Sequence, residues 1–91
     1  MTEIVPDLKI PEDVLFHELS GEAVLLNLKT GKYYGLDPVG TRMWLLLAEH
    51  KRIEPVVNIL LKEFDVDESR LRSDLLNLVI QLEAQGLLQT N

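Results

Sequence analysis

The spacing of apolar residues changes at Asp37-Pro38, from a repeat of two residues before this point to a helical repeat after it. Before it, Val24, Leu26 and Leu28 alternate with other residues, which is the pattern of a β-strand. After it, apolar side chains recur every three or four residues and lie within about 100° on a helical wheel. In the last third of the chain these are Leu71, Leu75, Leu78, Val79 and Leu82. The sequence therefore predicts an α+β fold, with strands first and helices after them.

The first half of the chain predicts three strands joined by two tight reversals. The strands are expected over residues 14–19, 22–28 and 32–36. Ser20-Gly21 and Gly31 mark the reversals, because glycine reaches the positive φ angles of hairpin loops at little cost. Two consecutive reversals give a three-stranded antiparallel meander, in which the third strand lies at an edge.

Three helices are expected after the strands, over about residues 38–49, 54–64 and 68–85. Asp37 and Asp67 are the predicted N-caps of the first and third helices, because an aspartate side chain accepts hydrogen bonds from the free amides of a first turn. Gly86 is expected to end the third helix. A three-stranded antiparallel meander followed by three helices is a winged-helix-like arrangement.

A chain of 91 residues provides one hydrophobic core, so we expect a single domain, placed at residues 14–88. Residues 1–13 are expected to be an N-terminal arm, since they lack clear periodicity and contain Pro6 and Pro11. The arm is expected to be extended and to pack locally through apolar residues. These are Ile4, Val5, Leu8 and Ile10.

The composition excludes several classes of function. The chain has no cysteine, which excludes disulfides, thiol catalysis and cysteine-ligated metals. Nine basic and fifteen acidic side chains give a net charge of −6, which argues against binding to nucleic acid or an anionic membrane. The chain has neither a long apolar run nor a recognisable signal peptide, so we expect a cytoplasmic protein.

Candidate catalytic and metal-binding groups are sparse. His17 and Ser20 are the one close histidine–hydroxyl pair, and the sequence offers no third group to orient them. Asp65, Asp67 and Glu68 lack the spacing and central glycine of a calcium loop, and helix capping explains them better. We therefore expect a protein that is not an enzyme and that holds no cofactor or metal.

The topology also permits a winged-helix transcription regulator or other DNA-binding protein. That function would place the third helix against phosphates. From residue 67 to residue 86, however, the chain carries two basic residues, Arg70 and Arg72, against four acidic ones. An acidic helix is unfavourable for this role.

An edge strand with free backbone groups favours peptide binding instead. An extended peptide can join residues 32–36 as a fourth strand, and Gly35 leaves room for its backbone. On the third helix, Leu76 and Ile80 lie beside the main apolar stripe and face either a neighbouring element or a ligand. A homodimer that pairs through the same edge is a further possibility.

Motifs along nearly the whole chain resemble the PqqD-like family. They form an ordered set that covers about residues 12–88. The segments are GEAVLL at 21–26, TGKYYGLDPVG at 30–40, Trp44, FDVD at 64–67, RSDLL at 72–76 and GLL at 86–88.

This resemblance implies a stand-alone precursor-peptide recognition element. Such a protein is a non-catalytic chaperone that binds the leader of a ribosomally made precursor peptide and presents the peptide to a modifying enzyme. The resemblance implies a radical S-adenosylmethionine enzyme in pyrroloquinoline quinone biosynthesis or a leader protease in lasso peptide biosynthesis, and both remain open. The implied leader site lies between the third strand and the third helix. Its residues are Lys32, Tyr33, Tyr34, Gly35, Leu36, Arg72, Leu75, Leu76 and Val79.

Overall fold

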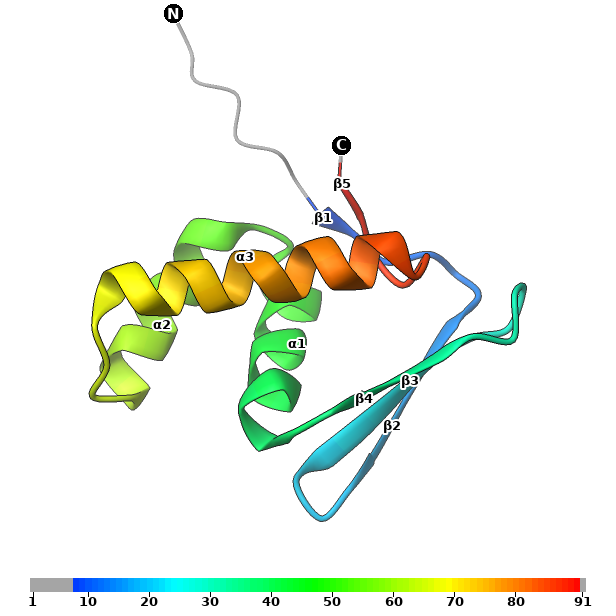
Figure 1. The fold of residues 1–91 in the computed structure, drawn as a ribbon, viewed down its shortest axis with the longest axis horizontal. Coiled ribbons are helices and arrows are strands. Elements are labelled where there is room, and N and C mark those ends of the chain that lie inside the picture. The colour runs from blue at the N-terminus through cyan, green and yellow to red at the C-terminus, as the bar shows by residue number, and fades with distance from the viewer. Residues whose placement is uncertain (1–7, 91) are drawn as a thin grey trace, which may run out of the picture.

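The structure is a computed structural model that describes residues 8–90 (Figure 1). In chain order its elements are β1 (Leu8–Lys9), β2 (Val14–Leu19), β3 (Glu22–Asn27), β4 (Tyr33–Leu36), α1 (Pro38–His50), α2 (Ile53–Glu63), α3 (Glu68–Ala84) and β5 (Gln89–Thr90). Strands β2, β3 and β4 form an antiparallel sheet in that order. The predicted meander followed by three helices is confirmed, and each helix bound lies within one residue of its expected position.

The central position of β3 follows from its side chains. Ala23, Leu25 and Asn27 are buried on the face that meets the helices, whereas Val24 is exposed on the opposite face. Ser20 and Gly21 both have positive φ angles, so a two-residue turn joins β2 to β3 in the geometry that suits a twisted hairpin. Because β3 pairs on both sides, β2 and β4 are the two edges of this sheet.

Asp37 turns the chain from β4 into α1. Its Oδ1 accepts a hydrogen bond from the amide of Gly40 at 2.7 Å, so the predicted N-cap is confirmed. A β-carbon on Gly40 would lie 3.1 Å from that oxygen and 3.4 Å from Cδ2 of Leu36. A side chain at position 40 would therefore crowd the cap, because the first turn of α1 approaches the end of β4 closely.

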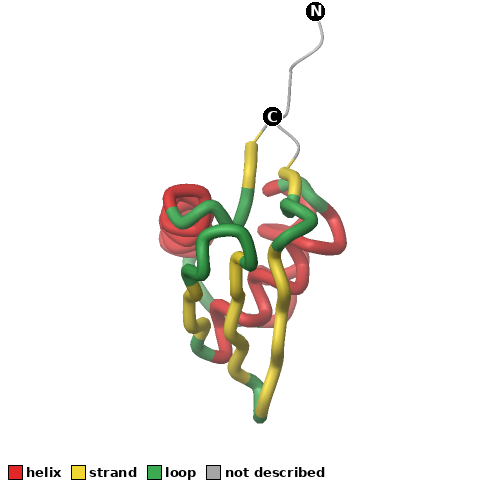
Figure 2. Tube along the Cα trace, turned by 90° about the vertical axis from the view of Figure 1, so that its right-hand side faces the viewer, coloured by secondary structure: helices red, strands yellow, loops and turns green. Residues whose placement is uncertain are grey.

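The core lies between the inner face of the sheet and the three helices. Helix α1 packs against β3 and β4, α2 packs on α1, and α3 packs on α2. Figure 2 shows the strands as one layer and the helices as a second layer behind them. The side chains with no exposed surface are Leu25, Leu47, Val56, Val57, Leu60, Leu75, Leu82 and Leu87.

Asn27 joins the sheet to the end of α3. Its Nδ2 donates to the carbonyl of Gly86 at 2.8 Å, and its Oδ1 accepts from the amides of Lys29 and Thr30 at 2.9 and 3.2 Å. Gly86 has a φ of 73°, the left-handed conformation expected for the residue that follows a helix. One buried amide therefore closes the turn after β3 and holds α3 against the sheet.

The N-terminal segment differs from the expected local arm. Strand β1 pairs antiparallel with β5, with Leu8 opposite Thr90. The Leu8 side chain is only 3% exposed within the core, and its amide donates to the carbonyl of Lys51 at 2.7 Å. Ile10 is partly buried against the same core, while Ile4 and Val5 lie outside the described residues. Two-residue strands show no periodicity, which is why the sequence pattern did not indicate this pairing.

Between residues 8 and 90, the helices are all too short or too polar to cross a membrane.

Substituting Leu8 tests whether the N-terminal strand belongs to the core. Leu8→Ala removes buried methyl groups and leaves a cavity, so we expect the free energy of unfolding to fall by about 2–5 kcal/mol. Lys9→Ala is the matched control, because the neighbouring Lys9 side chain is exposed. Urea denaturation followed by circular dichroism measures the free energy of unfolding of the two variants and of the wild type. Equal stability of the two variants would contradict the burial of Leu8.

Candidate functional site

The outer edge of β4 presents unpaired backbone groups. Within the sheet, Tyr34 lies opposite Leu25 and Leu36 opposite Ala23, and the amide of Asn27 donates to the carbonyl of Lys32 at 2.9 Å. Because hydrogen-bonded pairs alternate along an antiparallel ladder, the backbone groups of Tyr34 and Leu36 face β3. Those of Tyr33 and Gly35 face outward, where no strand of residues 8–90 pairs with them. The edge therefore offers two N–H and two C=O groups to an added strand.

A cavity of about 290 Å³ lies between this edge and α3. Tyr34, Gly35 and Leu36 of β4 line it, together with Asp37, Gly40 and Leu78. On the α3 side, the hydroxyl of Tyr34 donates a hydrogen bond to Oε1 of Gln81. The strand edge and one side of α3 thus form the two walls of a groove.

A second cavity of about 230 Å³ continues along the same side of α3. It is lined mainly by apolar side chains of α1, the α2–α3 connection and α3, with one base and one acid on α3. These residues are Val39, Met43, Phe64, Val66, Arg70, Leu71 and Asp74. Asp74 and Leu78 are one helical turn apart, so the two cavities follow one face of the helix. We call this face, made of Arg70, Asp74, Leu78 and Gln81, the groove face of α3.

The α3 residues expected at the leader site, Arg72, Leu75, Leu76 and Val79, do not line either of these cavities. Leu75 has no exposed surface and Val79 is 6% exposed, so both side chains belong to the core. Leu76 is 45% exposed but lies two residues from both Asp74 and Leu78, which turns it about 200° away from the groove face. Of the expected set, only Tyr34, Gly35 and Leu36 line the cavity beside α3.

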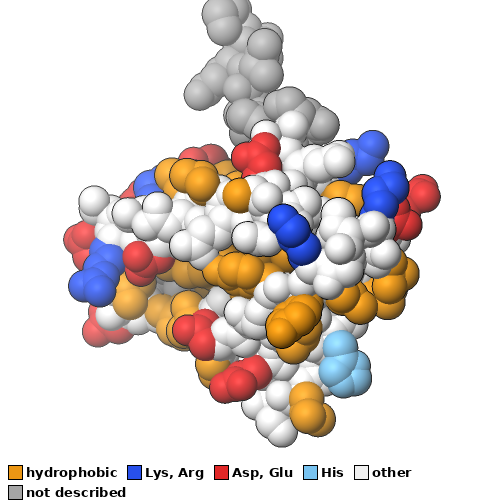
Figure 3. Space-filling view, turned by 45° about the vertical axis from the view of Figure 1, so that its right-hand side comes forward, with side chains coloured by type: hydrophobic (Ala, Val, Ile, Leu, Met, Phe, Trp, Pro, Cys, Tyr) orange, Lys and Arg blue, Asp and Glu red, His pale blue; other side chains and the backbone are white. Residues whose placement is uncertain are grey.

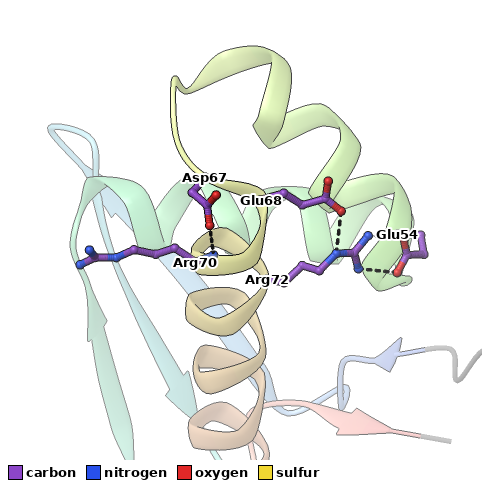
Figure 4. A network of polar contacts seen from close by, with 5 residues as sticks. All are labelled: Glu54, Asp67, Glu68, Arg70 and Arg72. Atoms are coloured by element: carbon purple, nitrogen blue, oxygen red, sulfur yellow. Dashed lines mark hydrogen bonds and ion pairs between the residues drawn. The ribbon is translucent and has the colours of Figure 1, made fainter.

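Arg72 points toward α2 and away from β4 (Figure 4). Its guanidinium nitrogens donate to the carboxylate of Glu54 at 2.7 and 2.8 Å and to Glu68 at 2.9 Å. The hydrogen bonds from Arg72 lower the pKa of Glu54, and the same contacts raise the pKa of Arg72. This side chain joins α2 to α3.

Side chains along β4 alternate between two faces. Tyr34 is half-buried and Leu36 is 5% exposed, and both point toward the helices. Tyr33 is 74% exposed and, like Gly35, belongs to the outer face of the sheet. Lys32 directly precedes the strand and is exposed. The five expected strand residues therefore divide between a groove side and an outer side.

The outer face of the sheet carries exposed apolar side chains. Leu15 and Leu19 of β2, Val24 of β3 and Tyr33 of β4 are all at least 44% exposed. A shallow cavity of about 490 Å³ lies on this side, lined in part by His17, Leu19, Val24 and Gly35. Figure 3 shows hydrophobic side chains gathered over the sheet. Exposed apolar clusters of this kind mark interaction surfaces.

The groove residues on α3 were missed because the helical repeat identifies the buried stripe but not the element that flanks it. Leu78 was recognised only as part of the stripe, and Gln81 and Asp74 carry no signal of their own.

Asp67 accepts a hydrogen bond from the amide of Arg70 at 3.1 Å, which confirms its capping role. Within residues 8–90, no group of three or more histidine or acidic side chains is arranged to hold a metal ion.

Comparison with known proteins agrees with this architecture. A family model described as "Coenzyme PQQ synthesis protein D (PqqD)" matches residues 22–88. A solved structure of TbiB1 in complex with the TbiA(beta) leader peptide is 41% identical, with a TM-score of 0.84, and the match covers 89% of this chain and 94% of that one. A lasso peptide synthetase B1 complexed with its leader peptide is 19% identical, with a TM-score of 0.82 and coverage of 91% and 98%, which shows a shared fold. Among curated proteins, none matches.

The contact between Arg72 and Glu54 predicts a pH-dependent contribution to stability. The folded-state pKa of Glu54 is lowered, so this contribution is present above the ordinary glutamate pKa of about 4.3 and is lost as the pH falls through the lowered value. We expect Arg72→Met to lower the urea midpoint at neutral pH. The difference in urea midpoint between Arg72→Met and the wild type should become smaller at acidic pH and at high salt concentration. A difference independent of pH would show that the ion pair is not its cause.

Proposed function

This chain belongs to the PqqD family, and we propose that it binds the leader segment of a ribosomally made precursor peptide and presents the peptide to a modifying enzyme. The observation that carries the proposal is the open edge of β4 beside the groove face of α3. The 41% identical structure, with a TM-score of 0.84, holds a leader peptide. A winged-helix transcription regulator is not favoured.

The leader adds to β4 rather than to β2. Both strands are edges of the sheet, but β4 lines the cavity of about 290 Å³ beside α3, and neither this cavity nor the one that continues along α3 involves a β2 residue. A strand on β4 gains backbone hydrogen bonds from Tyr33 and Gly35, and every second side chain enters the groove. Backbone pairing supplies affinity, and the groove supplies selectivity.

Side chains from two elements recognise the leader. On the strand, Lys32, Tyr33 and Gly35 meet its backbone or outer side chains, while Tyr34 and Leu36 form the groove wall. On α3 we assign the contacts to Leu78 and Gln81, with Asp74 and Arg70 further along the same face. Leu75 and Val79 support this wall from the core, and Arg72 holds α3 to α2. These roles follow from their burial and partners.

The role is one of binding without catalysis. The polar side chains beside the groove carry an amide, a phenol, carboxylates and the guanidinium of Arg70, and the hydroxyl of Tyr34 donates a hydrogen bond to the amide oxygen of Gln81. In the described part of the chain, neither His17 nor His50 lines either cavity along α3. Recognition by strand addition needs neither a cofactor nor a metal.

Two substitutions at Gly35 test the strand-addition model. Gly35→Pro removes an outward N–H while leaving the ladder with β3 intact, so the affinity for the TbiA(beta) leader should fall at least about tenfold. Gly35→Ala keeps the N–H, and its β-carbon would meet nothing within 4 Å, so its affinity should stay near the wild-type value. Calorimetry measures binding, and circular dichroism checks the fold. Equal affinities of the two variants would rule out pairing at this edge.

We propose further that the modifying enzyme docks on the outer face of the sheet. A bound leader extends the sheet beyond β4, so its outward side chains continue the apolar surface of Val24 and Tyr33. The surface to which the enzyme binds therefore includes both proteins. In the proposed arrangement the enzyme lies next to the peptide on which it acts.

Val24→Lys tests this docking surface. A charge in the middle of an apolar interface should weaken binding of the pathway's modifying enzyme to the leader complex at least about tenfold. Leader affinity should not change, since Val24 faces away from the groove. Leu76→Lys is the matched control, because Leu76 has the same exposure, 45% against 44%, but lies on α3. Enzyme binding that is unchanged in Val24→Lys, or that falls equally in the two variants, would contradict docking on the outer face of the sheet.

A further inference from the structure

We propose that the open edge of β2 pairs antiparallel with β2 of a second copy of this chain. In the described residues, β2 ends the sheet on the side away from β4, and every residue from Leu15 to Leu19 is exposed. The leader site on β4 stays accessible in such a dimer, because the two edges lie on opposite sides of β3. The inference therefore concerns a surface that the proposed function does not use.

The ladder between β2 and β3 determines which backbone groups point outward. The amide of Leu28 donates to the carbonyl of Asp13 at 2.8 Å, and Leu15 and His17 lie opposite Leu26 and Val24. Alternation along the ladder directs the backbone groups of Leu15, His17 and Leu19 toward β3. The N–H and C=O groups of Phe16 and Glu18 therefore face outward and are the groups that a second strand can reach.

In an antiparallel pair with His17 opposite His17 of the second copy, the outward N–H and C=O groups of Phe16 and Glu18 all find hydrogen-bond partners. Phe16 lies opposite Glu18 of the second copy, so the two residues with outward backbone groups form hydrogen-bonded pairs on both sides of the two-fold axis. On the outer face, Leu15 lies opposite Leu19 of the second copy. Each of these leucines is more than half exposed in the single chain, 51% and 72% respectively, and each gains an apolar cross-strand partner.

The two neighbouring registers are less favourable. A shift of two residues in one direction places Glu18 opposite Glu18 of the second copy, and like charges directly opposite are destabilising. A shift in the other direction places Leu19 opposite Asp13. Charge repulsion thus disfavours the register with Glu18 opposite Glu18, whereas the register with Leu19 opposite Asp13 also pairs Phe16 with Phe16, so the cysteine experiment below distinguishes it from the register centred on His17.

The sequence of β2 carries only part of the usual protection of an edge strand, since Glu18 is its one carboxylate and lies opposite Phe16 in this register. Residues 14–19 read VLFHEL, without proline or lysine, and pair with β3 over six consecutive positions. Natural proteins commonly disrupt or charge an edge of this length, because it otherwise pairs with another chain. A contact limited to one strand is small, in the class of transient interfaces that bury less than about 1,200 Å². We therefore expect a dimer that forms reversibly with increasing concentration.

Sedimentation of the full chain tests the dimer. The wild type should shift from monomer to dimer with rising concentration. Glu18→Pro, which removes an outward N–H without touching the β3 ladder, should remain monomeric, and Glu18→Ala should still dimerise. Gly35→Pro, on the other edge, should dimerise like the wild type. A wild type that stays monomeric at millimolar concentration, or a Glu18→Pro dimer, would overturn the proposal.

A single cysteine tests the register, because the natural chain has none. His17→Cys places two thiols in a pair without backbone hydrogen bonds, the closer kind, and should form a disulfide-linked dimer under mild oxidation. Val24→Cys, on the central strand, should stay unlinked. Crosslinking at Val24 but not at position 17 would overturn the register. Leader affinity of Glu18→Pro should equal that of the wild type, so loss of the dimer and loss of leader binding are separate results.

Discussion

The groove depends on the hydrogen bonds of Asn27. This side chain is only 6% exposed and bonds the carbonyl of Gly86, 59 residues further along the chain. The same amide holds the turn before β4 through Lys29 and Thr30. The edge strand and the end of α3 are therefore positioned by one side chain, and its loss would leave buried polar groups without partners.

Alternation along the strands allows a small sheet to serve several purposes. Inward side chains such as Leu25 and Leu36 build the core, and outward ones such as Val24 and Tyr33 leave an apolar surface. Backbone groups of alternate residues remain open at both edges. The two edges differ because α3 runs beside β4 only, so a strand added to β4 would meet both free backbone groups and the groove face of α3, whereas a strand added to β2 would meet free backbone groups and the exposed leucines of the outer face.

The parts of the fold that local chemistry specifies were predicted from the sequence. Asp37 and Asp67 mark helix starts because they accept hydrogen bonds from amides three residues ahead, and both contacts are present. Gly86 has the left-handed conformation expected after a helix. The pairing of Leu8–Lys9 with Gln89–Thr90 was not predictable, because two residues carry no periodicity and their partners are far apart in the chain.

The amino-acid sequence by itself determined the order of the elements, their ends and the edge position of β4, since these depend on contacts within a few residues. Only the tertiary structure decided which side of α3 faces β4. The apolar repeat shows that Leu75 and Val79 are buried, but the direction from which the sheet approaches depends on how α1 and α2 pack beneath the helix. For this reason Leu78 and Gln81, rather than Arg72 and Leu76, lie beside the open strand.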